Sequence, residues 1–413
     1  MKVHHALAAT VGALTVVGAL TACSGSSAPA SDGEVSLTLW ARGASVPDDV
    51  QKMLDEKFPD YDITFQNIPD IEDKLRAALR AKSGLPDVVI MGGGLPSFFE
   101  VSDAFVDLEK QAKNSDAVEW GLELGRNAEG RQVALPTDIG PWGFFYRADV
   151  FESLGYPSDP DEVSKMFGSW EDYRELAEAA SASGQFVCDH AGQVYQSRLA
   201  QEGYAYFAQE DGKDVNIVDS PISHDAFVES AALAQDSLCA NAEPYTPEWN
   251  AAVTQEKIVG FVGPAWEDGL LQSTGEKQSG LWRIATVPAG PAATGGSFVT
   301  AMSASAHPDA AAEVAGYIAS AEFQKPGYQE KGLFPASTGV FDDAEVATPR
   351  DFYAGQDTLG QLASTAEDAP LVYQSPDSNV VSSQFFVALN DLAFNGEDPE
   401  RTYEDLVKAN AAD

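Results

Sequence analysis

From residue 35 onward, short apolar or alternating segments are interleaved with amphipathic ones. The first kind has the length and period of strands, and the second repeats apolar residues at helical spacing. The predicted strands are 35–40, 61–65 and 87–91, and the predicted helices run from Ser45, as N-cap, to 58 and from Asp70 to 84. This order of strands and helices predicts a parallel sheet with right-handed connections.

Beyond residue 130 the pattern continues with longer interruptions. An extended segment at 133–147 is broken by Pro136, Gly140 and Pro141, which suits a chain that crosses between two lobes. The further predicted elements are a helix at 170–182 capped by Ser169, strands at 257–262, 282–287 and 298–303, and a helix at 308–320. Residues 184–245 are polar and aromatic, and their pattern sets no order of elements.

The first 33 residues follow a different pattern. Lys2 precedes an apolar run at 6–20, and small residues then lead to Cys23, as in a secretory signal. The run is too short for a membrane-spanning helix, which needs about 20 apolar residues. Residues 24–33 have the small and polar composition of a flexible linker. We therefore expect a signal peptide at 1–22, a tether at 23–33 and an exported domain beyond it.

Composition points to two lobes and limits the partners of the exported part. About 380 residues follow the tether, which is more than one hydrophobic core usually serves, and 44% of the chain is hydrophobic. The 64 Asp and Glu residues outnumber the 25 Lys and Arg residues, for a net charge of −39. Such a surface repels nucleic acid and anionic membranes, so we expect neither as a partner.

The sequence lacks the motifs that are typical of nucleotide binding, metal binding and hydrolytic catalysis. Residues 92–94 are three glycines without the Lys-Ser/Thr of a phosphate loop or the spacing of a dinucleotide site, so they suggest a close backbone approach instead. The five histidines show no zinc-ligand spacing, and no metal or cofactor is expected. Neither a nucleophile turn nor a distinctive pair of carboxylates marks a catalytic site.

Three cysteines remain to be assigned. If Cys23 is modified, Cys188 and Cys239 are left as a pair in an oxidising compartment, where disulfides persist. Closing this loop would stabilise the fold by roughly 4 kcal/mol in the chain-entropy account. The alternative is two buried free thiols.

A series of short motifs occurs in a particular order along the chain. They are Leu-Thr-Ala-Cys at 20–23, Trp40, Pro-Asp-Val-Val at 86–89, the segment 134–147, Gly-Pro-Ala-Trp at 263–266, Gly-Gly-Ser at 295–297, Glu-Phe-Gln at 322–324 and Gly-Leu-Phe-Pro-Ala at 332–336. This set resembles the extracellular solute-binding proteins of carbohydrate ABC importers (family 1), and 20–23 resembles a bacterial lipobox, in which the cysteine is lipidated. The alternative for the latter is an ordinary signal cut near Ala22.

The resemblance implies an α/β fold of two lobes, periplasmic-binding-protein-like, with a multi-segment hinge and no catalysis. We expect an N-terminal lobe of 34–137 and 299–336 and a C-terminal lobe of 138–298 and 337–413. It also implies a monomer, anchored to the outer face of the cell membrane by lipidated Cys23 alone. This protein would capture a neutral di- or oligosaccharide by hinge closure and deliver it to an ABC permease. The alternatives are a secreted glycoside hydrolase and a binding protein for a polyamine or peptide.

A neutral sugar offers hydroxyls and flat C–H faces, so its site needs aromatic planes and short polar groups. Trp266 follows a strand end and, by resemblance, stacks on a sugar ring; otherwise it is a core residue. Trp142 stacks similarly or wedges the hinge. Asp138 accepts sugar hydroxyls or caps a hinge turn. Gly296 and Ser297 match the family's Gly-Gly-Ser and contact the ligand, or form an ordinary turn.

The remaining candidates are more dispersed. Trp40 and Arg42 end the first strand and form the other wall of the cleft, unless Trp40 belongs to a core and Arg42 is a solvated charge. Gly93 is expected where the backbone approaches the ligand or the facing lobe. The set of expected ligand-binding residues is completed by Trp249 and Glu267.

Overall fold

The first sheet is built from segments far apart in the sequence. In the computed structural model, which describes residues 35–204, 206–210, 213–343, 345–346 and 350–411, its strand order is β2-β1-β3-β11-β4. Their bounds are β1 Val35–Ala41, β2 Tyr61–Asn67, β3 Val88–Met91, β4 Leu135–Pro136 and β11 Phe298–Ala301. Strand β1 is parallel to β2 and β3, as predicted, whereas β11 is antiparallel to β3 and β4. The expected signal peptide and the whole expected tether, including Cys23, lie outside the described residues.

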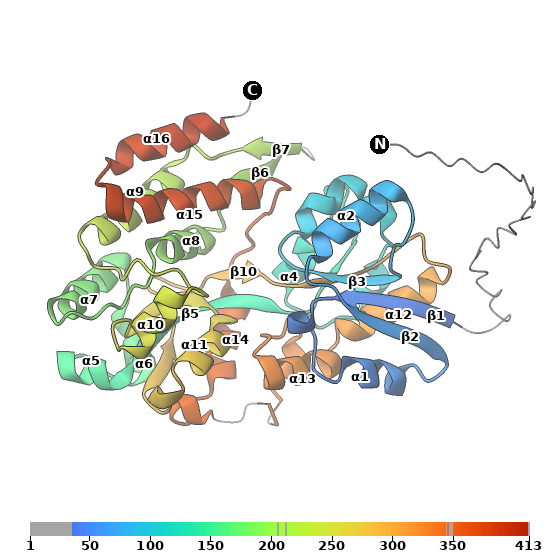
Figure 1. Cartoon of the computed structure of the whole chain (residues 1–413), viewed down its shortest axis with the longest axis horizontal. Coiled ribbons are helices and arrows are strands. Elements are labelled where there is room, and N and C mark those ends of the chain that lie inside the picture. Colours follow the sequence, from blue (N-terminus) through green and yellow to red (C-terminus); the bar gives the residue numbers. More distant parts are fainter. Residues whose placement is uncertain (1–34, 205, 211–212, 344, 347–349, 412–413) are drawn as a thin grey trace, which may run out of the picture. The chain divides into compact units, whose positions relative to one another are not determined.

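Alternation along the strands gives this sheet two buried faces. Val88 and Ile90 pack on one face with α1 and α12, while Val89 and Met91 pack on the other with α2. The helices that belong to it are α1 Val50–Lys57, α2 Ile71–Ala81, α3 Glu109–Ala112, α4 Glu119–Leu124, α12 Pro308–Ile318 and α13 Ala321–Lys331 (Figure 1). Both predicted crossover helices, α1 and α2, are therefore present.

One cap prediction is wrong. Helix α1 begins at Val50 with Asp49 as its N-cap residue, and Ser45 ends a separate 3-10 turn at Gly43–Ser45. The cause is Pro47, which disfavours helical backbone at the residue before it. Val46 accordingly adopts an extended conformation, with φ −141° and ψ 156°, and separates Ser45 from the helix.

The second sheet is centred on one fully buried strand, β5 Ile139–Arg147. Strands β10 Ala293–Gly295, β8 Gly260–Pro264 and β9 Trp282–Ala285 all pair with it in antiparallel orientation. Successive aromatic residues of β5 point to opposite faces: Phe145 joins a core with Phe261, and Phe144 joins another with Tyr173. The predicted strand at 257–262 is shifted to β8, and the elements of 184–245 are helical apart from one hairpin.

Helices surround this second sheet. They are α5 Ala148–Leu154, α6 Pro160–Met166, α7 Trp170–Ala182, α8 Ala191–Gln201, α9 Pro221–Gln235, α10 Pro247–Thr254, α11 Glu267–Thr274, α14 Thr358–Asp368, α15 Ser378–Asn395 and α16 Pro399–Asn410, with a hairpin of β6 Phe207–Glu210 and β7 Lys213–Asn216 (Figure 1). Ser169 caps α7 as predicted, since its hydroxyl accepts from Asp172 N. None of the helices in the described part is long and apolar enough to cross a bilayer.

A disulfide and a pair of hydrogen bonds connect segments that are far apart in the sequence. A disulfide joins Cys188 and Cys239, which are both buried, so the pairing expected from the sequence is present. Two of the chain segments that run between the sheets, 137–138 and 296–297, are hydrogen-bonded to each other. The Thr137 amide donates to the Ser297 carbonyl at 2.8 Å, and the Ser297 amide donates to Asp138 Oδ1 at 2.9 Å.

Candidate functional site

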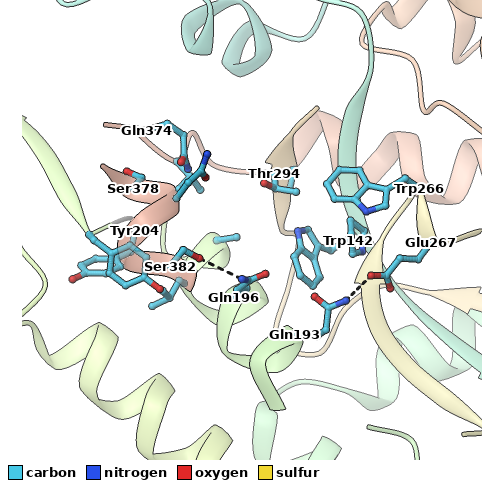
Figure 2. Close-up of a pocket in the computed structure, with 17 residues that line it drawn as sticks. Trp142, Gln193, Gln196, Tyr204, Trp266, Glu267, Thr294, Gln374, Ser378 and Ser382 are labelled. Carbon is cyan, nitrogen blue, oxygen red and sulfur yellow. Dashed lines mark hydrogen bonds between the residues drawn. The ribbon is translucent and has the colours of Figure 1, made fainter. Parts of the chain in front are cut away.

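The register of β5 against β8 brings two tryptophans to one cavity. Trp142 pairs with Pro264, and the chain then turns so that Trp266 immediately precedes α11. Figure 2 shows both indoles on one side of a cavity of about 300 Å³. Cavities that hold small molecules range from about 300 to 1,000 Å³, so this one lies at the lower end.

Trp266 offers the larger aromatic surface of the two. Its side chain is 36% exposed, which is unusual for so large an apolar group. On the covered side it packs on Gly140 of β5, where a β-carbon would lie less than 3.0 Å from the ring. An indole with one supported and one open surface is suited to stacking against a flat C–H face.

Trp142 is more deeply set. It is 3% exposed, and its Nε1 has no hydrogen-bond partner among the described residues. A buried indole N–H normally finds a partner because leaving it unpaired costs free energy. Trp142 lines the cavity, but its Nε1 is itself buried and unpaired among the described residues.

The opposite wall and base of the cavity carry amides and hydroxyls. Helix α8 contributes Gln193 and Gln196, and β10 contributes Thr294. The wall across from the indoles comes from the loop after α8 and from the C-terminal part of the chain: Tyr204, Gln374, Ser378 and Ser382 (Figure 2). Tyr206 and Asn379 also line the cavity. These groups both donate and accept hydrogen bonds without carrying a fixed charge.

Among the described residues that line the cavity, Glu267 is the only acidic or basic one. Burial is the main cause that raises the pKa of Glu267 well above its usual value, and the nearby Asp189 carboxylate raises this pKa further. Burial also raises the pKa of Asp189 to about 7, although the indole of Trp249 donates a hydrogen bond to it. Glu267 therefore favours its neutral form, and the cavity lining has little charge.

Asp138 lies where the chain crosses between the sheets. It is 7% exposed, and its Oδ1 accepts the Ser297 amide while its Oδ2 has no partner in the described part of the chain. Gly296 allows this approach, because a β-carbon there would lie less than 3.0 Å from Asp138. Burial raises the pKa of Asp138, against the lowering effect of the Ser297 hydrogen bonds and the Arg42 charge.

Residues 50–354 match the family described as bacterial extracellular solute-binding protein. The chain belongs to this family. Proteins of this kind bind solutes and are not enzymes, and their extracellular location agrees with an exported domain. No curated protein matches the sequence.

Solved structures of solute-binding proteins share the fold. An extracellular solute-binding protein of family 1 superposes with a TM-score of 0.83 at 21% identity, over 91% of this chain and 98% of that one. The galacto-N-biose/lacto-N-biose I-binding protein of Bifidobacterium longum, in complex with lacto-N-biose, gives 0.75 at 20% identity over 92% and 96%. The sugar-binding protein MalE of Xanthomonas citri gives 0.75 at 15% identity over 91% and 96%. This likeness confirms the predicted two-lobed, periplasmic-binding-protein-like α/β fold.

In this solute-binding protein only part of the residue set predicted from sequence lines the cavity. Trp142, Trp266 and Glu267 do so. Gly93 is exposed at the end of β3, and its carbonyl accepts a hydrogen bond from Asn379 at 2.9 Å.

Three further candidates lie away from the cavity. Trp249 is fully buried in a core beside Asp189, and a side chain without exposed surface has nothing to offer a ligand in this arrangement. Trp40 is 5% exposed and packs in a core under Lys74. Arg42 lies 3.8 Å from Glu72.

The polar half of the cavity was not predicted from the sequence. Gln193 and Gln196 lie one turn apart on α8, and Ser378 and Ser382 lie one turn apart on α15, so each pair shares a helix face. This spacing was the only feature of the sequence that could have indicated a polar helix face at these positions. It did not indicate which helix would face the tryptophans, because no order of elements was predicted for residues 184–245 and no helix was predicted at α15.

Proposed function

We propose that this solute-binding protein captures a neutral sugar, a di- or oligosaccharide, and delivers it to the permease of an ABC transporter. The observation that carries the proposal is the composition of the cavity wall. Two indoles, one of them 36% exposed, face a set of uncharged amides and hydroxyls. Aromatic planes match the C–H faces of a sugar, and mixed donors and acceptors match its hydroxyls.

The electrostatics of the cavity favour an uncharged ligand. No Lys, Arg or His is among the described lining residues, so nothing there would neutralise a carboxylate or phosphate. Glu267 is the one acidic group, and burial favours its neutral form. The similar protein of Bifidobacterium longum binds lacto-N-biose, which is in keeping with a neutral disaccharide here.

Capture would occur by closure of two lobes about the hinge. The proposed lobes are 34–137 with 299–336 and 138–298 with 337–413, and the bonded segments 137–138 and 296–297 are the natural pivot. Asp138, Gly296, Ser297, Arg42 and Gly93 would approach the sugar from the hinge and the N-terminal lobe. A ligand shifts the equilibrium between the open and closed forms toward the closed one, because the ligand contacts both lobes only in the closed form.

We also propose that Cys23 carries the lipid that holds the protein at the outer face of the cell membrane, as a monomer. Mass spectrometry of the protein from its native membrane would test this, since lipidation adds acyl mass to a peptide that begins at residue 23. A mature N-terminus elsewhere, without added mass, would contradict it.

A thermal-shift screen tests the ligand class. Neutral di- and oligosaccharides are compared with monosaccharides, uronic acids, spermidine and short peptides. A ligand at about 100 times its dissociation constant should stabilise the fold by about 2.7 kcal/mol. We expect the largest shift from a neutral di- or oligosaccharide, without turnover of it. A shift from spermidine or a peptide alone, or hydrolysis of an oligosaccharide, would contradict the proposal.

A further inference from the structure

Glu267 lines the base of the cavity but is almost entirely buried. Its side chain is 3% exposed, and its Oε1 accepts a hydrogen bond of 2.6 Å from Nε2 of Gln193. The other oxygen, Oε2, is buried and has no hydrogen-bond partner among the described residues. It points toward Gly263 of β8, where any β-carbon would collide with it. The strand is therefore shaped to accommodate this carboxyl group.

This contact decides which end of the Gln193 amide faces the ligand. A primary amide has a donating and an accepting end, and the NH₂ end of Gln193 is directed at Glu267. Figure 2 shows the dashed bond from the Gln193 nitrogen to Glu267 and the Gln193 oxygen on the other side of the amide. A proton on Oε2, the oxygen that accepts no bond, would leave Oε1 as the acceptor of the Gln193 amide.

A purely structural role explains this arrangement poorly. A buried carboxyl with one unpaired oxygen costs free energy, and the adjacent Asp189 carboxylate adds to that cost. An apolar residue of similar size would fill the same space without either cost. The carboxyl therefore reduces stability while ordering a group that lines the cavity.

We propose that Glu267 is a positioning residue, which holds the Gln193 amide so that its carbonyl oxygen accepts a hydrogen bond from a ligand hydroxyl. The proposal deepens the proposed function and rests on it. It implies that specificity for one hydroxyl of the sugar is set by a buried residue that acts through the Gln193 amide. A sugar that lacks this hydroxyl leaves the amide oxygen unpaired in the closed cavity.

The test is a double-mutant cycle in the full-length mature protein, read by calorimetric Kd and by thermal melting. The probe is whichever solute of the screen the wild type binds best, so a failure of the sugar assignment leaves the test in place. We expect E267L to weaken binding about tenfold, as loss of one ordered hydrogen bond does, with an unchanged or higher melting temperature. In a Q193A background, E267L should have no further effect on Kd.

Rescue by conservative changes gives a second arm, which does not depend on the leucine variant folding. E267Q keeps the acceptor oxygen and should bind within about threefold of wild type, because only the unpaired oxygen is replaced. Q193E removes the donor and should weaken binding, while Q193E/E267Q restores the bond with its polarity reversed. The control is D55L, which removes a carboxylate that accepts from the amide of Gln51 on α1, away from the cavity, and should leave Kd unchanged.

Three results would overturn the proposal. The first is a wild-type Kd in E267L. The second is an equal loss from E267L with and without Gln193. The third is a failure of E267Q/Q193E to bind better than Q193E alone. A lower melting temperature of E267L with unchanged affinity would instead assign Glu267 a structural role.

Discussion

Gly140 on β5 and Trp266, in the turn between β8 and α11, are in direct contact. Gly140 is opposite Thr294 in the β5–β10 pair, and a β-carbon at position 140 would lie less than 3.0 Å from the Trp266 ring. The glycine is thus the support on which the exposed indole rests. The orientation of that indole depends on a residue that was not among the expected ligand contacts.

The substitution G140V should weaken ligand binding at least about tenfold, since a hydrophobic contact with a side chain this size is worth a few kcal/mol. The added carbons displace Trp266 from its position over the strand. Calorimetric titration with the solute identified by the screen measures the effect. G269A is the matched control on the helix that follows Trp266, because its nearest neighbouring atom lies at an ordinary 3.6 Å. An unchanged Kd for G140V would show that the position of Trp266 does not contribute to ligand binding.

Trp266 and Trp249 should respond in opposite ways to substitution by alanine. W266A removes a 36% exposed indole and should cost affinity with little change in melting temperature. W249A removes a fully buried one and should lower the unfolding free energy by about 3–5 kcal/mol through the cavity it leaves. Chemical denaturation and calorimetry on both variants give the comparison. A Trp249 variant that is stable but fails to bind would reverse the assignment.

Asp138 should matter chiefly through its acceptor oxygen. D138N retains an oxygen for the Ser297 amide, whereas D138A leaves that amide unpaired in a buried hinge and should cost about 1–3 kcal/mol of stability. Equilibrium unfolding in urea measures both variants. Measuring the ligand affinity of the same variants tests the predicted contact between Asp138 and the sugar. If this contact exists, D138N binds the ligand more weakly than wild type although its stability is unchanged.

Stability should fall as the pH rises toward neutrality because of Asp189. The pKa of this group is about 7 in the folded protein and 3.8 when unperturbed, so the folded state holds a proton that the unfolded state releases. The contribution is therefore fully present below pH 3.8 and is lost as the pH rises toward about 7. The difference in melting temperature between wild type and D189N from pH 4 to 8 measures this contribution together with its interaction with Glu267. A constant difference between the two across this range would contradict the prediction.

The Cys188–Cys239 disulfide should contribute about 4 kcal/mol by restricting the unfolded chain. Both cysteines are buried, so a reductant reaches them only when the protein opens. The C188A/C239A variant should show the lower stability in non-reducing buffer. As a control, reduction of the wild-type protein should lower its stability by the same amount. Equal stability of the oxidised and reduced protein would show that the disulfide does not contribute to stability.

Local sequence was enough to predict much of the first sheet and its helices. Apolar periodicity placed β1, β2, β3 and α2, because each of these elements buries residues at the period of its own backbone. The error at Ser45 arose from local chemistry as well, through Pro47 and the extended residue before it. The cysteine pairing followed from counting, and the structure contains it.

The site required the tertiary structure. In the sequence, Trp40, Trp142, Trp249 and Trp266 are equivalent large apolar residues. Pairing of β5 with β8 brings Trp142 and Trp266 to the cavity, while packing of α10 buries Trp249 in a core. The polar wall joins α8 to α15, more than 170 residues further on. Hydrophobic period identifies which side of an element is buried, but the partner that covers it, or leaves a cavity beside it, is set by contacts between distant segments.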